Sequence, residues 1–225
     1  MKPMNKVFEN TSEQIKSTTE ILRSSGFVTF DNPPERNITP KRQQLTWSNS
    51  VSGRSVSGKA FLTIDQYLTI LSANSYQLLL QDYSIVRYSF VFDGAHLIQQ
   101  NLLWWPCPVK MDEDIENEFG LIQGIKQKIN SSNNQSDYIM RSPIRIDFDS
   151  TKDTSSHPRA HTHFEHADCR VNSIEPICFN RFMRFIIENF YPESKILCNK
   201  WNYLTYQYQD RYKKATYDNH TTLVI

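Results

Sequence analysis

The amino-acid sequence predicts an α+β fold, a mostly antiparallel sheet with helices packed on one face. Residues 85–92 and 97–105 are rich in β-branched and aromatic side chains, and Asp93-Gly94 between them favours a tight hairpin turn. Residues 176–191 instead repeat apolar side chains at helical spacing and begin with Pro176, which suits a first helical turn. Together, a long hairpin and an amphipathic helix indicate the α+β class.

The first third of the chain supplies two helices and one strand in this prediction. A helix is expected over residues 5–25, ending before Gly26, and a short strand over residues 27–30. Residues at about 31–58, rich in proline, serine, asparagine and arginine, are expected to form a long irregular loop. A second helix should begin after Thr63, whose hydroxyl is a candidate N-cap.

The later elements are expected from the same patterns. Residues 76–80 are apolar and leave helix and strand open. Residues 112–129 are acidic at the start and basic at the end, as a helix prefers, although two glycines weaken the pattern. Strands are expected over residues 138–148, with an interruption at a proline, and over residues 159–164. We leave the assignment of the aromatic tail, residues 201–225, open.

Composition limits the class of protein. The 225 residues predict a single domain over 1–225. There are 25 basic and 24 acidic residues, whereas proteins that coat nucleic acid usually have a basic excess, so any nucleic-acid contact must be local. The sequence has neither a stretch of ~20 apolar residues nor an apolar leader core, so we expect a cytoplasmic protein with no membrane contact. The four cysteines are irregularly spaced, which predicts reduced thiols.

One motif resembles a phosphate-binding loop but is rejected. Residues 53–59 contain two glycines and a following lysine at the right separation. However, Ala60 stands where a serine or threonine should hold magnesium, and the preceding residues are polar rather than a buried strand. We interpret this segment as an ordinary loop.

A dense histidine cluster is the strongest candidate for chemistry. His157, His161, His163 and His166 fall within ten residues, and Cys169-Arg170 follows directly. Because strand side chains alternate between faces, a strand over 159–165 would place Arg159, His161, His163 and Glu165 on one face. If the segment were helical instead, His157 and His161 would be neighbours one turn apart.

The preceding strand carries the same alternation. Its apolar residues face one way, and Arg145, Asp147 and Asp149 face the other. A hairpin between the two strands would bring both polar faces onto one surface. Such a concentration of arginines, carboxylates and imidazoles favours a functional site.

Three interpretations of this surface compete. The first is phosphodiester catalysis: the histidine pair moves protons or binds metal, the carboxylates orient the histidines or hold metal, and the arginines bind phosphate. The second is a zinc site built from the histidines and Cys169. The third is a structural or partner-binding role. The candidate catalytic residues are His161, His163, Asp147, Arg159 and Arg170. The candidate metal ligands, for zinc, magnesium or manganese, are His161, His163, His166 and Asp149.

The aromatic tail offers a second candidate contact with nucleic acid. Aromatic and basic side chains are mixed there, as they are in proteins that bind single strands, although a core segment gives the same pattern. These residues are Trp201, Tyr203, Tyr206, Tyr208, Arg211, Tyr212, Lys213 and Lys214.

Several short motifs resemble a bacterial family known as domain of unknown function 2290. The resemblance covers about the C-terminal two thirds of the chain and brings no established activity. Its layout is also similar to that of small toxins from toxin–antitoxin loci. The motifs that carry it are Arg145-Ile146-Asp147-Phe148, Ser156-His157-Pro158, His161-x-His163, Cys169-Arg170-Val171, and Pro176 through Phe182 and Phe185 to Asn189-Phe190-Tyr191.

The function that we expect is a nuclease-like effector: a nucleic-acid-directed phosphodiester hydrolase of a bacterial defence or toxin system. The alternative is a non-enzymatic partner or regulatory subunit of a larger bacterial defence complex. The near-zero net charge, the abundant aromatics and the long loop at 31–58 suit that alternative. In either case we expect a protein partner encoded nearby.

Overall fold

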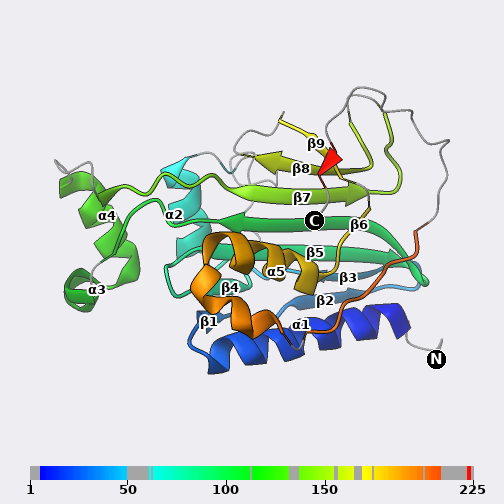
Figure 1. Cartoon of the computed structure of the whole chain (residues 1–225), viewed down its shortest axis with the longest axis horizontal. Helices are drawn as coiled ribbons and strands as arrows, with labels where there is room; N and C mark the ends of the chain where they lie inside the picture. Colours follow the sequence, from blue (N-terminus) through cyan, green and yellow to red (C-terminus); the bar gives the residue numbers. More distant parts are fainter. Residues whose placement is uncertain are drawn as a thin grey trace.

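The computed structural model of the chain is an α+β fold built on one sheet, as the sequence predicts (Figure 1). It describes residues 6–49, 61, 63–111, 113–131, 137–154, 157–164, 169–173, 175–199, 201–208 and 222–223. The strands are β1 (Val28–Asp31), β2 (Glu35–Ile38), β3 (Gln43–Thr46), β4 (Leu78–Leu80), β5 (Ile85–Asp93), β6 (His96–Trp105), β7 (Ile144–Asp149), β8 (Ala160–Phe164), β9 (Val171–Ser173) and β10 (Thr222–Leu223). The helices are α1 (Lys6–Ser24), α2 (Ile64–Ser72), α3 (Glu113–Phe119), α4 (Leu121–Ser131), α5 (Phe179–Phe190) and the 3-10 helix η2 (Pro192–Cys198).

The sheet is mostly antiparallel. Its order is β1-β4-β5-β6-β7-β8-β9-β10, with β3 also pairing with β5 and β2 pairing with β3. Among the described strands, β9 and β10 form the one parallel pair. The predicted hairpin is the centre of the sheet, since β5 and β6 pair from Ile85↔Trp105 to Asp93↔His96. Gly94 has the positive φ, 54°, that the turn requires.

Local signals place most boundaries within a few residues of expectation. Thr63 caps α2 in a capping box with Gln66, as its hydroxyl indicated. The open segment 76–80 contains strand β4. The helix expected over 112–129 is divided into α3 and α4 at Gly120, whose φ of 72° no continuous helix accepts.

Residues 31–49, the described part of the segment 31–58, differ from the expected irregular loop. β2 and β3 form an antiparallel hairpin, and β3 extends the sheet along β5. Every β2 side chain is exposed, so the alternation of buried and exposed side chains that marks a half-buried strand is missing. Main-chain pairing of β2 with β3 and of β3 with β5, together with the buried Leu45, therefore orders residues 35–46. Residues 50–60, including the rejected motif over 53–60, lie outside the described residues.

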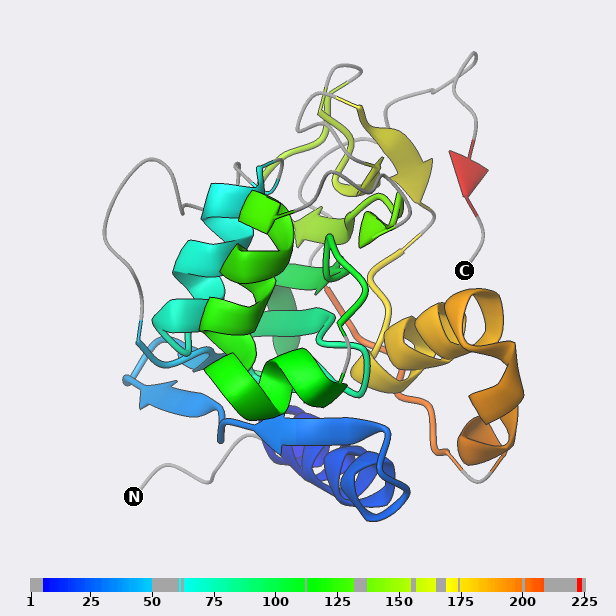
Figure 2. The ribbon, with the colours of Figure 1, turned by 90° about the vertical axis from the view of Figure 1, so that its left-hand side faces the viewer.

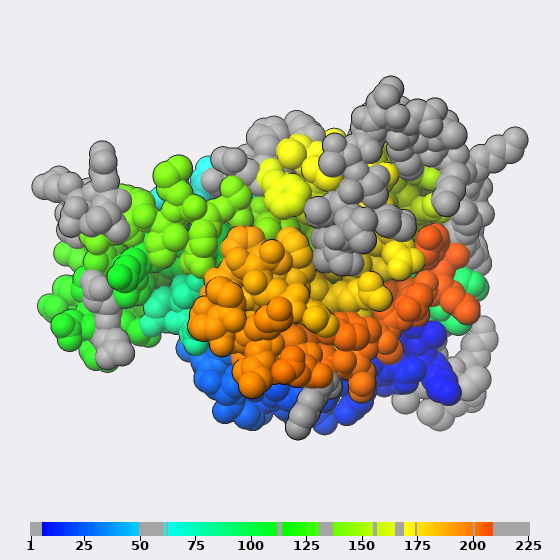
Figure 3. Space-filling view, viewed as in Figure 1, coloured from blue at the N-terminus to red at the C-terminus, as the bar shows by residue number. Residues whose placement is uncertain are grey.

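Two hydrophobic clusters lie on opposite faces of the sheet. α1 and α5 pack on the face that carries Leu102 and Trp104, while α2 and α4 pack on the face that carries Leu103 and Trp105. Figure 2 shows α2 and α5 on opposite sides of the strands. In Figure 3, α5, η2 and residues 201–208 cover the middle of the face turned to the viewer. Helices thus pack on one face of the sheet, as expected. On the opposite face, α2 and α4 cover one end, and polar side chains of β5–β8 gather beside these two helices.

Within the described part of the chain, none of the helices combines the length and the apolar character that crossing a bilayer requires.

Candidate functional site

Strands β7 and β8 form the predicted hairpin and present polar side chains on the face opposite α1 and α5. Ile144, Ile146 and Phe148 point into the first hydrophobic cluster, so alternation turns Arg145 and Asp147 the other way. The register pairs Asp147 with His161 and Arg145 with His163. This pairing brings four side chains of the expected polar face together, and it excludes the helical interpretation of residues 160–164.

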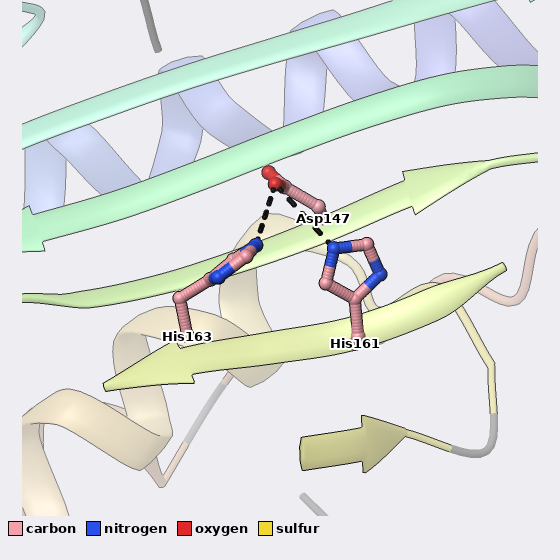
Figure 4. A group of neighbouring side chains, drawn as sticks. All are labelled: Asp147, His161 and His163. Atoms are coloured by element: carbon pink, nitrogen blue, oxygen red, sulfur yellow. Dashed lines mark ion pairs between the residues drawn. The ribbon is translucent and has the colours of Figure 1, made fainter. Parts of the chain in front are cut away.

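Asp147, His161 and His163 form a compact group of potential metal ligands. The Asp147 Oδ2 atom lies 3.3 Å from His163 Nε2 and 3.8 Å from His161 Nε2. Figure 4 shows both rings turned from β8 toward the carboxylate on β7. One ligand atom from each residue lies within 4.8 Å of the others. Both histidines are 1% exposed, so the two imidazole rings are shielded from bulk water.

The tautomer of His161 follows from its hydrogen bond. Its Nδ1 lies 2.7 Å from the Pro158 carbonyl oxygen, which can only accept, so Nδ1 carries the proton. In the neutral ring, Nε2 therefore presents a lone pair toward Asp147. Burial is the main cause that lowers the pKa of His161, to about 4, so the ring is neutral at physiological pH. A backbone carbonyl that fixes the tautomer in this way is typical of metal-binding histidines.

Asp147 is held as a carboxylate by its neighbours. Burial alone would raise the pKa of Asp147, but the contact with His163 and the charge of Arg145 outweigh burial and lower the pKa below its ordinary value. The Asn101 amide on β6 donates to Asp147 Oδ1 over 2.6 Å, which leaves Oδ2 turned to the histidines.

Arg145 is a buried cation with unused donors. It is 5% exposed, and its Nη2 lies 2.9 Å from Asp147 Oδ2. Its Nε and Nη1 have no hydrogen-bond partner within the described structure. Burial lowers the pKa of Arg145, but the group remains charged, since an arginine pKa lies far above neutrality. Free guanidinium donors beside a cleft are suited to an anionic ligand.

Phe61 closes one side of the group. Its buried ring packs on Trp105 and His163, with centroid distances of 6.4 Å in each case. The Arg145 guanidinium lies over the same ring, 4.8 Å from its centroid. The second hydrophobic cluster thus forms an apolar wall beside the polar side chains, which strengthens electrostatic interactions there.

A cleft of about 420 Å³ runs across the strands above this group. Trp47 and Gln44 border it near β3, and Lys152, His157 and Arg170 border it near β7 and β8. Its charged lining groups are three cations, Arg145, Lys152 and Arg170, and two carboxylates, Asp147 and Asp149. The cleft therefore suits a negatively charged ligand.

The structure brings some predicted site residues together and separates others. His161, His163 and Asp147 converge, and Arg170 borders their cleft. Asp149 borders the cleft too, but its carboxylate accepts hydrogen bonds from the main-chain N–H and the hydroxyl of Thr151. Asp149 therefore stabilises the turn after β7. His166 lies outside the described residues.

Arg159 and Cys169 also depart from the expected cluster. β8 begins at Ala160, one residue after Arg159, so the alternation does not carry Arg159 into the site. Arg159 instead lies 3.8 Å from Asp153 and over the ring of Tyr208. Cys169 is exposed and stands apart from the group of potential ligands.

Sequence reasoning missed three contributors: Trp47, Phe61 and Asn101. Trp47 lies inside the segment 31–58 that was expected to be a loop, and Phe61 follows that segment. Their contact with the site depends on how the distant strands pair, so no local pattern predicts it. Asn101 could have been found by extending the alternation to β6, since Asn101 pairs with Asp147.

Three of the four described aromatic residues of the tail contribute to the core, whereas Tyr203 is exposed and its hydroxyl accepts a hydrogen bond from Arg184. Trp201 and Tyr206 are buried in the first hydrophobic cluster, and Tyr208 packs against it. These three side chains therefore pack in or against the hydrophobic core, which was the alternative to a contact with nucleic acid. Residues 211–214 lie outside the described part of the chain.

Comparison with known proteins identifies the family and nothing further. Residues 27–224 match the family described as "Uncharacterized conserved protein (DUF2290)", and the chain belongs to this family. No curated protein and no solved structure matches the chain. A functional argument must therefore start from the site itself.

Proposed function

We propose that this DUF2290 protein is a metal-dependent phosphodiester hydrolase directed at nucleic acid, with Asp147, His161 and His163 as metal ligands. The observation that carries the proposal is that two hydrogen-bond acceptors, one on His161 and one on Asp147, face each other. His161 Nε2, with its lone pair, faces the Asp147 carboxylate at 3.8 Å. Because lone pair and carboxylate repel each other, a cation between them would make the arrangement favourable.

The spacing of the three ligand atoms suits a divalent metal. Ligands about 2.0–2.2 Å from a tetrahedral zinc ion lie roughly 3.3 Å apart. The two contacts to Asp147 Oδ2 measure 3.3 and 3.8 Å, and all three ligand atoms lie within 4.8 Å of one another, so side-chain rotations could bring them into the range of a zinc ion. Three protein ligands leave a position open for water, which is how catalytic zinc sites differ from structural ones.

The chemistry of such a site is hydrolysis. A divalent ion held by Asp147, His161 and His163 would supply Lewis acidity and make water at the site easier to deprotonate. In the hydrolysis of a phosphodiester, the oxygen of one water adds to phosphorus. The bond from phosphorus to the leaving oxygen breaks, and that oxygen takes up a proton, so one water yields a phosphomonoester and an alcohol. The free donors of Arg145 would stabilise the negative charge that develops on the phosphoryl oxygens.

The charge of the cleft supports an anionic substrate over a neutral one. With a divalent ion bound, the lining would hold three cationic side chains and the metal against two carboxylates. Two histidines and a carboxylate also serve iron(II) in oxygenases. The surplus of cations around the group favours phosphodiester hydrolysis over oxidation of an uncharged compound.

Metal binding and hydrolysis test the proposal together. The full chain, stripped of metal, is titrated calorimetrically with Zn²⁺, Mn²⁺ and Mg²⁺, and each form is assayed on bis(p-nitrophenyl) phosphate and on RNA and DNA strands. We expect one ion per chain and metal-dependent hydrolysis, both lost in the double variant His161→Ala/His163→Ala and in Asp147→Asn. His96→Ala is the control, because His96 lies at the hairpin end of β6, where it pairs with Asp93, far along the sheet from Asp147, His161 and His163. This variant should retain metal binding and hydrolysis.

Two results would overturn the proposal. One is equal metal binding by the double variant and the wild type, provided that circular dichroism shows both folded. The other is tightly bound iron together with no hydrolysis by the zinc, manganese or magnesium forms, which would point to redox chemistry.

A role in a bacterial defence or toxin system is the finer part of the proposal. It rests on the similarity of layout to small toxins of toxin–antitoxin loci and predicts that expression of the wild type slows bacterial growth. The double histidine variant should relieve this effect. If a partner encoded nearby is instead required for any phenotype, and the chain alone hydrolyses nothing, the non-enzymatic alternative is favoured.

A further inference from the structure

We infer that the substrate enters the cleft as a single strand of nucleic acid, and that Trp47 is the platform on which one of its bases stacks. This inference rests on the proposed function, because it names the form of substrate for the same cleft. Two observations support it: the contact that holds the Trp47 ring in place, and the polar residues that line the cleft between Trp47 and Asp147.

Trp47 is fixed by a stacked arginine. It follows β3 and borders the cleft. The Arg87 guanidinium, from β5, lies 3.8 Å from the centre of the indole ring. Arg87 is only 4% exposed, so the indole covers it from one side. A guanidinium against one ring face holds the indole plane in place and leaves the opposite face turned away from Arg87. A half-buried tryptophan mounted in this way is ready to receive a second planar group.

The floor of the cleft between Trp47 and the potential metal ligands Asp147, His161 and His163 is polar and runs across the strands. Gln44 on β3 donates to the Ser89 hydroxyl on β5 over 3.4 Å, and Asn101 on β6 donates to Asp147 on β7. β3 and β7 are three strand spacings apart in the sheet order, about 14 Å at ~4.8 Å per spacing. A base on Trp47 and a phosphate at Asp147 would therefore belong to an extended chain.

The two ends of the cleft differ in chemistry. The aromatic platform borders it near β3, whereas Arg145, Lys152 and Arg170 border it near β7 and β8. Proteins that hold single strands combine an aromatic side chain under a base with basic groups along the phosphates. In a duplex both faces of each base are covered by its neighbours, so a base can reach Trp47 only when unstacked.

A free nucleotide offers the same base and phosphate, and the experiment separates it from a strand. Fluorescence anisotropy is measured in EDTA, where no cleavage occurs, with labelled RNA and DNA strands of about 12 nucleotides. The competitors are the matching duplex and the mononucleotides. We expect the strand to bind at least tenfold more tightly than either competitor.

Variants of Trp47 then test the platform. Trp47→Ala should weaken strand binding by about 5- to 150-fold, the range for loss of one base–aromatic stack. Trp47→Phe should recover most of the affinity, and this second variant guards against a folding defect in the first. The variant His96→Ala, on β6 and outside the residues that line the cleft, should bind the strand as the wild type does in EDTA.

The results separate this inference from the proposed function. Unchanged strand affinity in a folded Trp47→Ala protein, or a duplex or mononucleotide that binds as tightly as the strand, would overturn the inference even if hydrolysis persists. Strand binding that depends on Trp47, without hydrolysis by any metal form, would sustain the inference and refute the proposed function.

Discussion

Replacing Asp147 by asparagine should separate the stability of the metal-free protein from its stabilisation by metal. Asp147 Oδ2 lies 2.9 Å from Nη2 of Arg145, which is 5% exposed. Asparagine keeps the size of the side chain but removes its charge, so the buried guanidinium loses its partner. Breaking a buried pair costs about 3–5 kcal/mol. Because 22% of the Asp147 side chain is exposed, we expect the lower end, about 3 kcal/mol.

Metal should act in the opposite direction on the wild type. A ligand that binds only the folded state, at a free concentration about 100 times its Kd, adds about 2.7 kcal/mol of stability. For a chain of 225 residues, each kcal/mol shifts Tm by about 2–4 °C. Metal should therefore raise the Tm of the wild type by about 5–11 °C. Metal-free Asp147→Asn should melt about 6–12 °C below the metal-free wild type, and metal should recover little of that loss.

Thermal unfolding followed by circular dichroism, with and without EDTA, measures both effects. Asp149→Asn is the matched control, since Asp149 borders the same cleft but accepts its hydrogen bonds from Thr151 and Gln99 rather than facing the histidines. It should keep the full metal-induced rise. The reasoning fails if metal raises the Tm of Asp147→Asn as much as that of the wild type, or if none of zinc, manganese and magnesium raises the Tm of the wild type.

Four further outcomes follow from single side chains. Arg145→Lys should lower kcat about 100-fold with metal stoichiometry unchanged, because the point charge of lysine lacks the free guanidinium donors; steady-state kinetics and elemental analysis check this, and an unaltered kcat would remove Arg145 from the mechanism. Phe61→Ala should cost about 3–5 kcal/mol in urea unfolding, since a ring 1% exposed is deleted; a loss below about 1 kcal/mol would mean that this wall contributes little packing. Gly120→Ala should destabilise the α3–α4 junction by about 1–2 kcal/mol, because alanine is strained at a φ of 72°, and an unchanged urea midpoint would count against the break described there. Brief alkylation of the native protein should modify Cys169 first, since the other three thiols are buried; mass spectrometry locates the adduct, and equal labelling of all four would contradict this burial.

The polar face of the site could be predicted because a strand alternates strictly. Residues 144–149 and 160–164 each show a period of two, so the sharing of one face by Asp147, His161 and His163 followed from the sequence alone. The choice between Asp147 and Asp149 did not, because that choice depends on register and on the turn. The register pairs Asp147 with His161, while Asp149 lies where the chain turns and binds Thr151.

The parts that sequence reasoning missed depend on contacts between distant segments. β2 is exposed throughout and is ordered by pairing, so no burial pattern could reveal it. Trp47 meets Arg87 and Phe61 meets His163 across about 40 and 100 residues of chain, respectively, distances over which local propensity carries no information. Arg159 shows the opposite failure. Alternation was extended one residue beyond the observed start of β8, and the side chain lies elsewhere.

Several buried polar atoms of the site have no hydrogen-bond partner in the described part of the chain, and together they indicate which chemical groups a ligand would need. Within the described residues, Arg145 Nε and Nη1 lack acceptors, and His161 Nε2 and both ring nitrogens of His163 have no hydrogen-bond partner. Each buried group left in this way costs about 1–3 kcal/mol. A cation alone would satisfy the lone pair of His161 but would leave the arginine donors unused and add to their repulsion. An anion alone would satisfy the arginine but would bring more acceptors toward Asp147 and the histidines. A divalent cation together with a phosphodiester anion would satisfy the lone pair of His161 and the donors of Arg145 at once.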